Sequence, residues 1–411
     1  MNTSLRRQNL LAKLPERALV FIFSGHAPAR SQDENYPFSV NRNFYYLTGI
    51  DRENMCLVLD KNGDKTCEML FIEPFDPVLA RWVGGKMLPD EATEISGIED
   101  IRYINELEDS VFGRYERSLR YNLPIIYLDM WRNELGQNDS DGIKYAKFLK
   151  DKYPQLEIRD IYNEITSLRL VKSDEEIEEI KKAIAITRFG IAEMMKHIRP
   201  EMNEMMMDAT FDFAMAIKGC REHAFPTIAA SGARATTLHY SENNNVMKDG
   251  ELFLCDLGSA YKHYCSDISR TFPVNGKFSE RQKEIYEIVL EVQRRIQEAA
   301  KPGVKMADIQ KMVIDFYAEE LPKHGLNKDV SEYYFHGFGH HLGLDTHDVD
   351  GGLGQVLNEG NVITDEPGLY IADEGIGIRI EDDLLITAEG AICLSQDIIK
   401  NVDDIENFMK H

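Results

Sequence analysis

The chain has 411 residues, of which 43% are hydrophobic and 28% charged, and its formal net charge at pH 7 is −23. This length and apolar content suffice for two domains with buried cores, whereas the acidic balance, without a basic block, argues against nucleic acid or an anionic membrane as a partner. The N-terminal stretch lacks a signal-peptide core, and the six cysteines lack zinc-type spacing. We therefore expect a soluble cytoplasmic protein with free thiols.

The first 165 or so residues alternate short apolar runs with helical patterns. The strand-like runs are 18–25, 43–50, 55–60, 67–73 and 123–130, and residues 90–95 are one of the helix-like segments between them. This alternation is typical of an α/β domain with a mixed sheet. We expect such a domain over residues 1–167.

A helix-start signal marks the second domain. Ser173 followed by Glu176 forms a capping box, and the acidic residues after Ser173 favour the positive end of the helix dipole. The predicted helices are 174–198, 202–219, 280–300 and 306–321, and hairpin-like strands lie between them. Helices combined with antiparallel strand pairs predict an α+β domain over residues 168–411. We expect the tail, 403–411, to be a frayed end.

The stretch ELFLCDLGSAYKHYCSDISRTFP, residues 251–273, resembles one β-hairpin. If Asp256 pairs directly with Asp267, the turn centres on Tyr261 and Lys262 and both carboxylates project from one face. Like charges so placed favour a cation between them, although two solvated carboxylates remain an alternative. By strand alternation Cys255 points to the opposite face as a core thiol, and His263, near the tip, is expected to face solvent.

Residues 335–348, FHGFGHHLGLDTHD, hold four of the eleven histidines of the chain, among glycines that permit close backbone approach. Histidine is a common metal ligand and acid–base group, so this cluster indicates a functional loop, although a cluster without function is an alternative. Glu366 follows soon after, at the end of an apolar run and before a Pro-Gly turn.

The stretch GIGIRIEDDLLIT alternates in the manner of a strand, with Arg379 and Glu381 on one face and isoleucines on the other. Buried charge needs a partner, which a metal would supply. The alternative is the solvated face of an amphipathic strand.

Together these stretches supply four carboxylates and one imidazole: Asp256, Asp267, His340, Glu366 and Glu381. Two divalent ions about 3.5–4 Å apart can share such a set. Oxygen-rich ligation with one nitrogen favours Mn²⁺, Co²⁺, Fe²⁺ or Zn²⁺. Two such ions lower the pKa of a water held between them to about 7, which predicts hydrolytic chemistry.

The sequence resembles the pita-bread metallopeptidases, and within them the aminopeptidase P (Xaa-Pro aminopeptidase) family. The matching stretches span nearly the whole chain: NRNFYYLTGI, LRLVKSDEEIEEI, DLGSAYKHYCSDISRTFPVNGKF, HGFGHHLGLDTHD, DEPGLYI and GIGIRIEDDLLIT. The resemblance implies an α/β N-terminal domain followed by an α+β pita-bread catalytic domain.

The resemblance also implies roles for individual residues. The five residues named above correspond to the ligands of two metal ions, with Asp267 and Glu381 bridging and Glu366 doubling as the base. His347 is similar to the family histidine that contacts substrate and steadies the tetrahedral intermediate, and His239 to a second histidine lining the site. Arg379 and Tyr370 resemble residues that support the ligands.

The implied reaction is release of the N-terminal residue from peptides whose second residue is proline, with Mn²⁺ as the expected ion and a homo-oligomer, dimer or tetramer, as the expected assembly. A prolidase, which cleaves Xaa-Pro dipeptides, uses the same ligands and is the main alternative. A methionine aminopeptidase would leave the N-terminal domain without a use, and creatinase-like relatives lack a full ligand set. A non-catalytic interaction protein on the same fold is the remote alternative.

Overall fold

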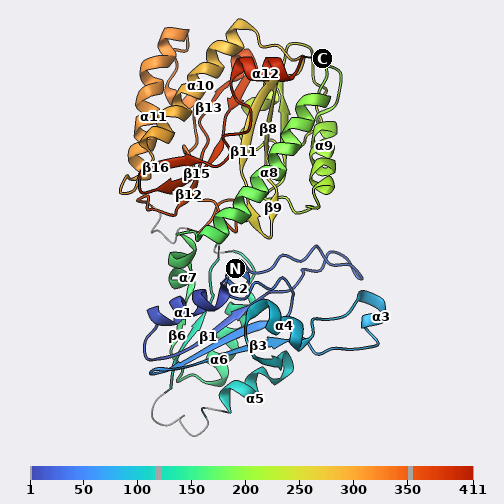
Figure 1. The fold of residues 1–411 in the computed structure, drawn as a ribbon, viewed down its shortest axis with the longest axis vertical. Coiled ribbons are helices and arrows are strands. Elements are labelled where there is room, and N and C mark those ends of the chain that lie inside the picture. The colour runs from blue at the N-terminus through green and yellow to red at the C-terminus, as the bar shows by residue number, and fades with distance from the viewer. Residues whose placement is uncertain are drawn as a thin grey trace. The chain divides into compact units, whose positions relative to one another are not determined.

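The structure, a computed structural model, describes residues 2–113, 115, 123–132, 134, 136–349 and 355–410. It divides into two compact units, residues 1–169 and 170–411, which run from blue to green and from green to red in Figure 1. Each unit has its own sheets and helices. No helix in the described ranges combines the length and apolar character that a bilayer crossing requires.

A six-stranded sheet forms the centre of the first unit, in the order β4-β3-β2-β1-β5-β6. Its strands are β1 Arg17–Phe23, β2 Cys56–Asn62, β3 Lys65–Ile72, β4 Asp100–Tyr103, β5 Ile125–Leu128 and β6 Ile158–Asp160. The pairs β1–β2 and β2–β3 are antiparallel, and the other three are parallel. The mixed sheet predicted from the sequence is therefore confirmed.

The first unit's helices are α1 Thr3–Lys13, α2 Arg42–Thr48, α3 Ala80–Val83, α4 Pro89–Ser96, α5 Leu107–Phe112, α6 Asp141–Lys152 and α7 Tyr162–Arg169. Helix α2 corrects a prediction, because residues 43–50 were expected to form a strand. The Asn41 side chain accepts a hydrogen bond from the Phe44 amide, and Gly49 ends the helix with a φ of 72°. These two caps stabilise a short helix in an otherwise strand-like apolar run.

In the second unit, two pairs of helices flank the strands (Figure 1). The helices are α8 Asp174–His197, α9 Glu204–Ile217, α10 Glu280–Ala299, α11 Met306–Glu320 and α12 Val402–Phe408. Helix α8 begins with the predicted capping box of Ser173 and Glu176, packs against α9 and covers the β9–β11 region. Helix α10 packs against α11 and covers strands β12, β13, β14 and β16.

The second unit's strands are β7 Ile228–Ser231, β8 Leu252–Leu257, β9 Ala260–Tyr261, β10 Tyr264–Cys265, β11 Ile268–Pro273, β12 Val362–Asp365, β13 Gly368–Ile371, β14 Ile376–Arg379, β15 Asp382–Thr387 and β16 Gly390–Cys393. They form two three-stranded sheets, β11-β8-β7 and β12-β15-β16, and two ribbons, β9-β10 and β13-β14. All pairs are antiparallel, in agreement with the α+β prediction.

The predicted hairpin exists, but its register differs by two residues. Asp256 pairs with Ser269, not with Asp267, and the turn consists of Lys262 and His263, with φ values of 51° and 64°. A two-residue turn with two positive φ angles matches the twist of the flanking strands. Because a shift of two residues preserves the alternation of faces, Asp256 and Asp267 still project to the same side.

His263 was expected to face solvent, and that expectation is wrong. The residue is only 7% exposed, because its Nδ1 lies 2.8 Å from Glu222 Oε1. Cys255 is buried as predicted, and burial raises the pKa of its thiol to about 12.

The C-terminal tail is also not frayed. Residues 402–408 form helix α12, whose Val402 and Ile405 are buried together with Met409 just beyond it. The Phe278 amide donates to Glu406 Oε1 at 3.1 Å. Tertiary packing therefore orders a segment that has weak helical character of its own.

Candidate metal centre

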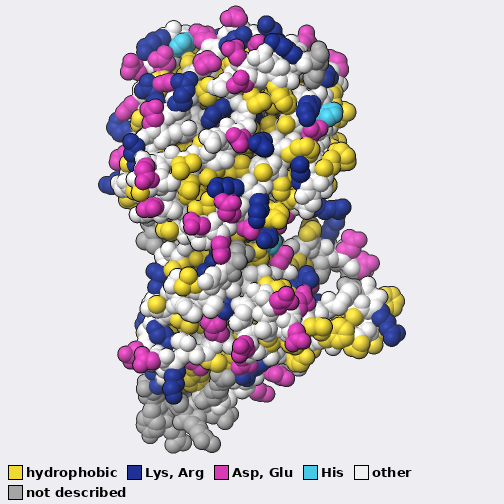
Figure 2. Space-filling view, in the orientation of Figure 1, with side chains coloured by type: hydrophobic (Ala, Val, Ile, Leu, Met, Phe, Trp, Pro, Cys, Tyr) yellow, Lys and Arg dark blue, Asp and Glu magenta, His cyan; other side chains and the backbone are white. Residues whose placement is uncertain are grey.

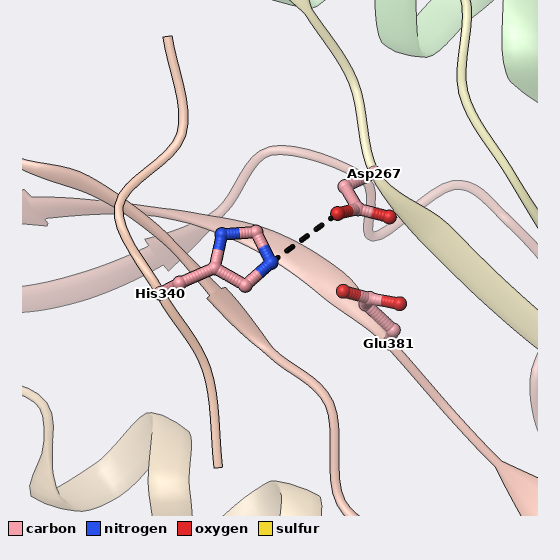
Figure 3. Close-up of side chains that lie close together, drawn as sticks. All are labelled: Asp267, His340 and Glu381. Carbon is pink, nitrogen blue, oxygen red and sulfur yellow. Dashed lines mark ion pairs between the residues drawn. The ribbon is translucent and has the colours of Figure 1, made fainter. Parts of the chain in front are cut away.

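The predicted ligand residues lie at strand ends and loops of the second unit. Asp256 is near the end of β8, Asp267 immediately precedes β11, His340 lies in the loop before β12, Glu366 connects β12 to β13, and Glu381 connects β14 to β15. Segments more than a hundred residues apart in the sequence thus supply one site. Figure 3 shows Asp267, His340 and Glu381 pointing toward one another.

The distances in this group suit metal coordination. One ligand atom each from Asp267, His340 and Glu381 lies within 4.8 Å of the other two. His340 Nε2 is 3.4 Å from Asp267 Oδ2 and 3.6 Å from Glu366 Oε1. The other ring nitrogen, Nδ1, donates to the His341 carbonyl at 3.0 Å, so Nε2 is the nitrogen that faces the carboxylates.

The His340 backbone is fixed against strand β12. The His340 amide donates to Thr364 Oγ1 at 3.1 Å, and the Thr364 amide donates back to the His340 carbonyl at 2.9 Å. This approach requires Gly339, since a Cβ there would lie 2.1 Å from the Thr364 carbonyl oxygen.

Arg379 connects residues that lie behind the predicted ligands. Its guanidinium donates to Asp256 Oδ2 at 2.6 Å, Tyr370 Oη at 2.9 Å and Ser269 Oγ at 2.7 Å. Ser269 Oγ in turn donates to Glu381 Oε2 at 2.7 Å. Arg379 and Glu381 are each 2% exposed, so the alternative of a solvated strand face is wrong.

The site concentrates buried negative charge. Burial, and then the neighbouring Asp256, raise the pKa of Asp267 well above its usual range. Burial and Asp267 do the same to Glu381. The pKa of Glu366 rises to about 7, mainly through burial. Asp256 Oδ1 is buried without a hydrogen-bond partner among the described residues. A bound cation would relieve each of these penalties, so the residues present fit divalent metal ions.

The predicted substrate histidines are exposed, in contrast to the ligands. The His347 ring centroid lies 4.3 Å from that of His340. Partial burial, then His340 and His239, lower the pKa of His347. His239 therefore lies near enough to influence His347 electrostatically.

His336 belongs to the site but was not singled out from the sequence. Its Nε2 lies 2.9 Å from Tyr370 Oη and its Nδ1 lies 3.6 Å from Glu366 Oε2. Burial, and then Arg379, lower its pKa to about 4, which favours the neutral ring. The signal was its place in the four-histidine stretch, which does not distinguish it from its neighbours.

Comparison with known proteins places this geometry in a family. Metallopeptidase family M24 matches residues 178–388, and the N-terminal domain of aminopeptidase P matches residues 4–120. The chain belongs to the M24 metallopeptidases. Within that family it falls with the aminopeptidase P group, as the resemblance implied, and the predicted combination of an α/β domain with a pita-bread domain is confirmed.

Individual relatives of this metallopeptidase agree over almost its whole length. A Haemophilus influenzae Xaa-Pro aminopeptidase is 34% identical, over 98% of this chain and 96% of its own. A solved Bacillus anthracis structure assigned as an aminopeptidase P is 44% identical, with a TM-score of 0.96, over 99% and 97% of the two chains. Zn-substituted Escherichia coli aminopeptidase P in complex with product is 32% identical, with a TM-score of 0.89, over 99% and 97%.

Proposed function

We propose that this metallopeptidase is an Xaa-Pro aminopeptidase, which releases the N-terminal residue from peptides with proline in second position. The observation that carries the hydrolytic part is the convergence of Asp267, His340 and Glu381 ligand atoms within 4.8 Å. The proline preference is supported by relatives named Xaa-Pro aminopeptidase and by the N-terminal domain of that group.

Two divalent ions would be held by Asp256, Asp267, His340, Glu366 and Glu381, with Asp267 and Glu381 shared between them. We propose Mn²⁺, with Co²⁺, Fe²⁺ and Zn²⁺ as the alternatives that an oxygen-rich, single-nitrogen donor set allows. When bound, the ions supply Lewis-acid polarisation of the scissile carbonyl and a lower pKa for the attacking water.

The side chains of the chain would handle the protons and the developing charge. Glu366 accepts the proton of the attacking water and passes it to the product nitrogen. His347, exposed beside His340, donates a hydrogen bond to the oxyanion, and His239 lines the same opening. Arg379 and Tyr370 hold Asp256 and the neighbouring ligands in orientation.

We further propose a homo-oligomer, dimer or tetramer. Large apolar side chains gather on the surface around α3, where Trp82 is 83% exposed and Val78 67% (Figure 2). A contiguous exposed apolar patch is typical of an interaction surface. Sedimentation of the purified protein tests this, and a strict monomer would contradict it.

The proposed location is the cytoplasm, with peptides as partners and neither nucleic acid nor membrane. The support is the net charge of −23, together with six free cysteines. On the face shown in Figure 2, Lys and Arg are interspersed with Asp and Glu. Fractionation of the native cells tests the location.

The decisive experiment offers the Mn²⁺-loaded protein an Xaa-Pro dipeptide and a longer Xaa-Pro-Xaa peptide, and follows release of the first residue. Cleavage of the longer peptide supports the proposal, whereas cleavage of the dipeptide alone identifies a prolidase. If neither is cleaved while metal is bound, the non-catalytic alternative gains support.

The His347→Ala variant should retain metal and lose about 10²- to 10³-fold in turnover, and unchanged turnover would remove His347 from the mechanism.

A further inference from the structure

One of the buried ion pairs outside the ligand set lies next to His347. Lys172 Nζ lies 2.9 Å from Asp348 Oδ2, and each side chain is 1% exposed. Lys172 stands directly before the N-cap of α8, and Asp348 directly follows His347. A buried ion pair is seldom more stabilising than apolar residues of the same volume, so this pair calls for a role other than stability.

Lys172 is held firmly from its own side. Its amide donates to the Gly360 carbonyl at 2.8 Å, and Asn361 Nδ2 donates to the Leu170 carbonyl at 2.9 Å. Both partners lie in the turn that leads into β12, the strand that also fixes His340 through Thr364. The Lys172 backbone is therefore held by the turn before β12, and β12 also holds the backbone of His340.

Asp348 ends the loop that begins at His341. Its amide donates to the His341 carbonyl at 2.8 Å, which closes the loop, and Thr346 Oγ1 donates to the Ala224 carbonyl at 3.0 Å. A Cβ on Gly343 would lie 2.3 Å from Asp348 Oδ2 and 2.9 Å from Lys172 Cε. The loop thus crosses directly over the ion pair, and a side chain at position 343 would have to displace it.

We infer that Lys172 and Asp348 are positioning residues for His347. Their ion pair anchors the residue next to His347, so that the exposed imidazole stays 4.3 Å from the His340 ring. The inference rests on the proposed function, because it concerns the histidine assigned there to the oxyanion. Neither residue is placed in contact with substrate or metal.

Removing one charge should displace the other. In Lys172→Met the Asp348 carboxylate stays buried without its cation, which drives it toward water and moves the adjacent His347. We expect turnover of the Xaa-Pro-Xaa peptide to fall about 10- to 100-fold, as loss of a supporting partner does. Metal content and KM should stay close to those of the unmodified protein.

The first readout does not depend on activity. The ring resonances of His347 are recorded by NMR in the metal-free protein and assigned by their loss in His347→Gln. Lys172→Met should shift them and leave those of the exposed His197 in place. Unshifted His347 resonances in a folded Lys172→Met protein would overturn the inference, whether or not the unmodified protein cleaves peptides.

A double variant separates positioning from stability. Lys172→Met/Asp348→Leu removes both charges and refills their volume, so it should fold even if the single variant does not, and recover thermal stability. In the double variant, turnover should remain low and the His347 resonances should remain shifted. If turnover and resonances both returned to those of the unmodified protein, the ion pair would have only a structural role. Met215→Ala, which truncates a buried side chain of α9, is the matched control and should lose stability without either change. If the unmodified protein cleaves no Xaa-Pro peptide, the proposed function is wrong. The His347 resonances alone then test whether Lys172 and Asp348 position His347.

Discussion

The sheets of the two units bury different chemistry. In the first unit, β1 buries the apolar residues 18–22 at 0% exposure. In the second unit, β12, β14 and β15 bury Asp365, Arg379, Asp382 and Asp383 at 0–2% exposure. Apolar burial is favourable by itself, at about 25 cal/mol per Å². Buried charge is costly unless a partner balances it, so the second unit depends on its pairings.

The buried acids of the second unit differ in their ionic partners. Asp382 has two cationic partners, Arg270 at 2.7 Å and Lys400 at 2.5 Å. Among the described residues, the ion pairs of Asp267 and Glu366 are with histidines, which carry charge only when protonated. Asp256 of the candidate metal centre, in contrast, pairs with Arg379 at 2.6 Å. A bound metal would therefore balance the buried charge around Asp267 and Glu366 in the second unit, whereas the sheet of the first unit buries mainly apolar side chains.

The largest effect should come from removing Glu381, which we propose as a ligand shared by both ions. Glu381→Ala should abolish metal binding. Loss of one transition-state contact lowers the rate of hydrolysis ~10²- to 10³-fold, and the loss of rate in Glu381→Ala should be larger than that. Metal content by mass spectrometry and peptide hydrolysis are the measurements. Glu389→Ala, which removes an exposed acid of the same unit, is the control and should change neither. A Glu381→Ala protein that kept its metal would refute the assignment.

Chelation should affect the two units unequally. A ligand that binds only the folded state at 1,000 times its Kd stabilises it by about 4 kcal/mol. Removing the metal should therefore accelerate hydrogen exchange in β8, β11, β12 and β14 and leave β1 and β2 unchanged. Hydrogen-exchange mass spectrometry with and without Mn²⁺ makes the comparison. Equal acceleration in both units would mean that the charge balance is not confined to the second.

Local signals in the sequence predicted much of this architecture. The capping box at Ser173 and the strand alternation around Arg379 depend on neighbours a few residues away, and both were found. The ligand candidates followed from carboxylates at such positions, together with the resemblance to a known family. The caps of α2 at Asn41 and Gly49 were local as well, but the aromatic run between them favoured a strand and outweighed them.

The other errors arose where distant contacts decide the structure. The Lys262–His263 turn adopts positive φ angles, which are uncommon for residues other than glycine, and Glu222, about 40 positions away, holds His263 in place. Helix α12 is ordered by packing of Val402 and Ile405. The place of His336 in the site depends on its contacts with Tyr370 and Glu366, which come close to it only when the chain is folded.

A conservative change in the apolar sheet should have a smaller effect, and on stability alone. Ile126 in β5 is fully buried, and Ile→Val at such a site costs about 0.5–1.5 kcal/mol. Ile126→Val should accelerate exchange in β1 and β5 and leave metal affinity, measured by titration calorimetry, unchanged. The matched variant is Ile380→Val, equally buried but adjacent to Glu381, which we expect to weaken metal binding. Weaker metal binding in Ile126→Val would show that the units are coupled.

The smallest effect should come from charges paired at the surface of the second unit. Hydrogen bonds to Glu284 at 2.7 Å and Glu320 at 3.1 Å raise the pKa of His324. The pairing therefore contributes fully below the ordinary pKa of about 6.5 and is lost as the pH rises through the raised folded-state value. The His324 side chain is 23% exposed, so solvent screening should keep its contribution below about 1 kcal/mol. His324→Gln should lower the Tm slightly at pH 6 and not at pH 9, and salt should reduce the difference at pH 6. A large loss, or one that persists at pH 9, would show that exposed pairs matter to this unit as much as buried ones do.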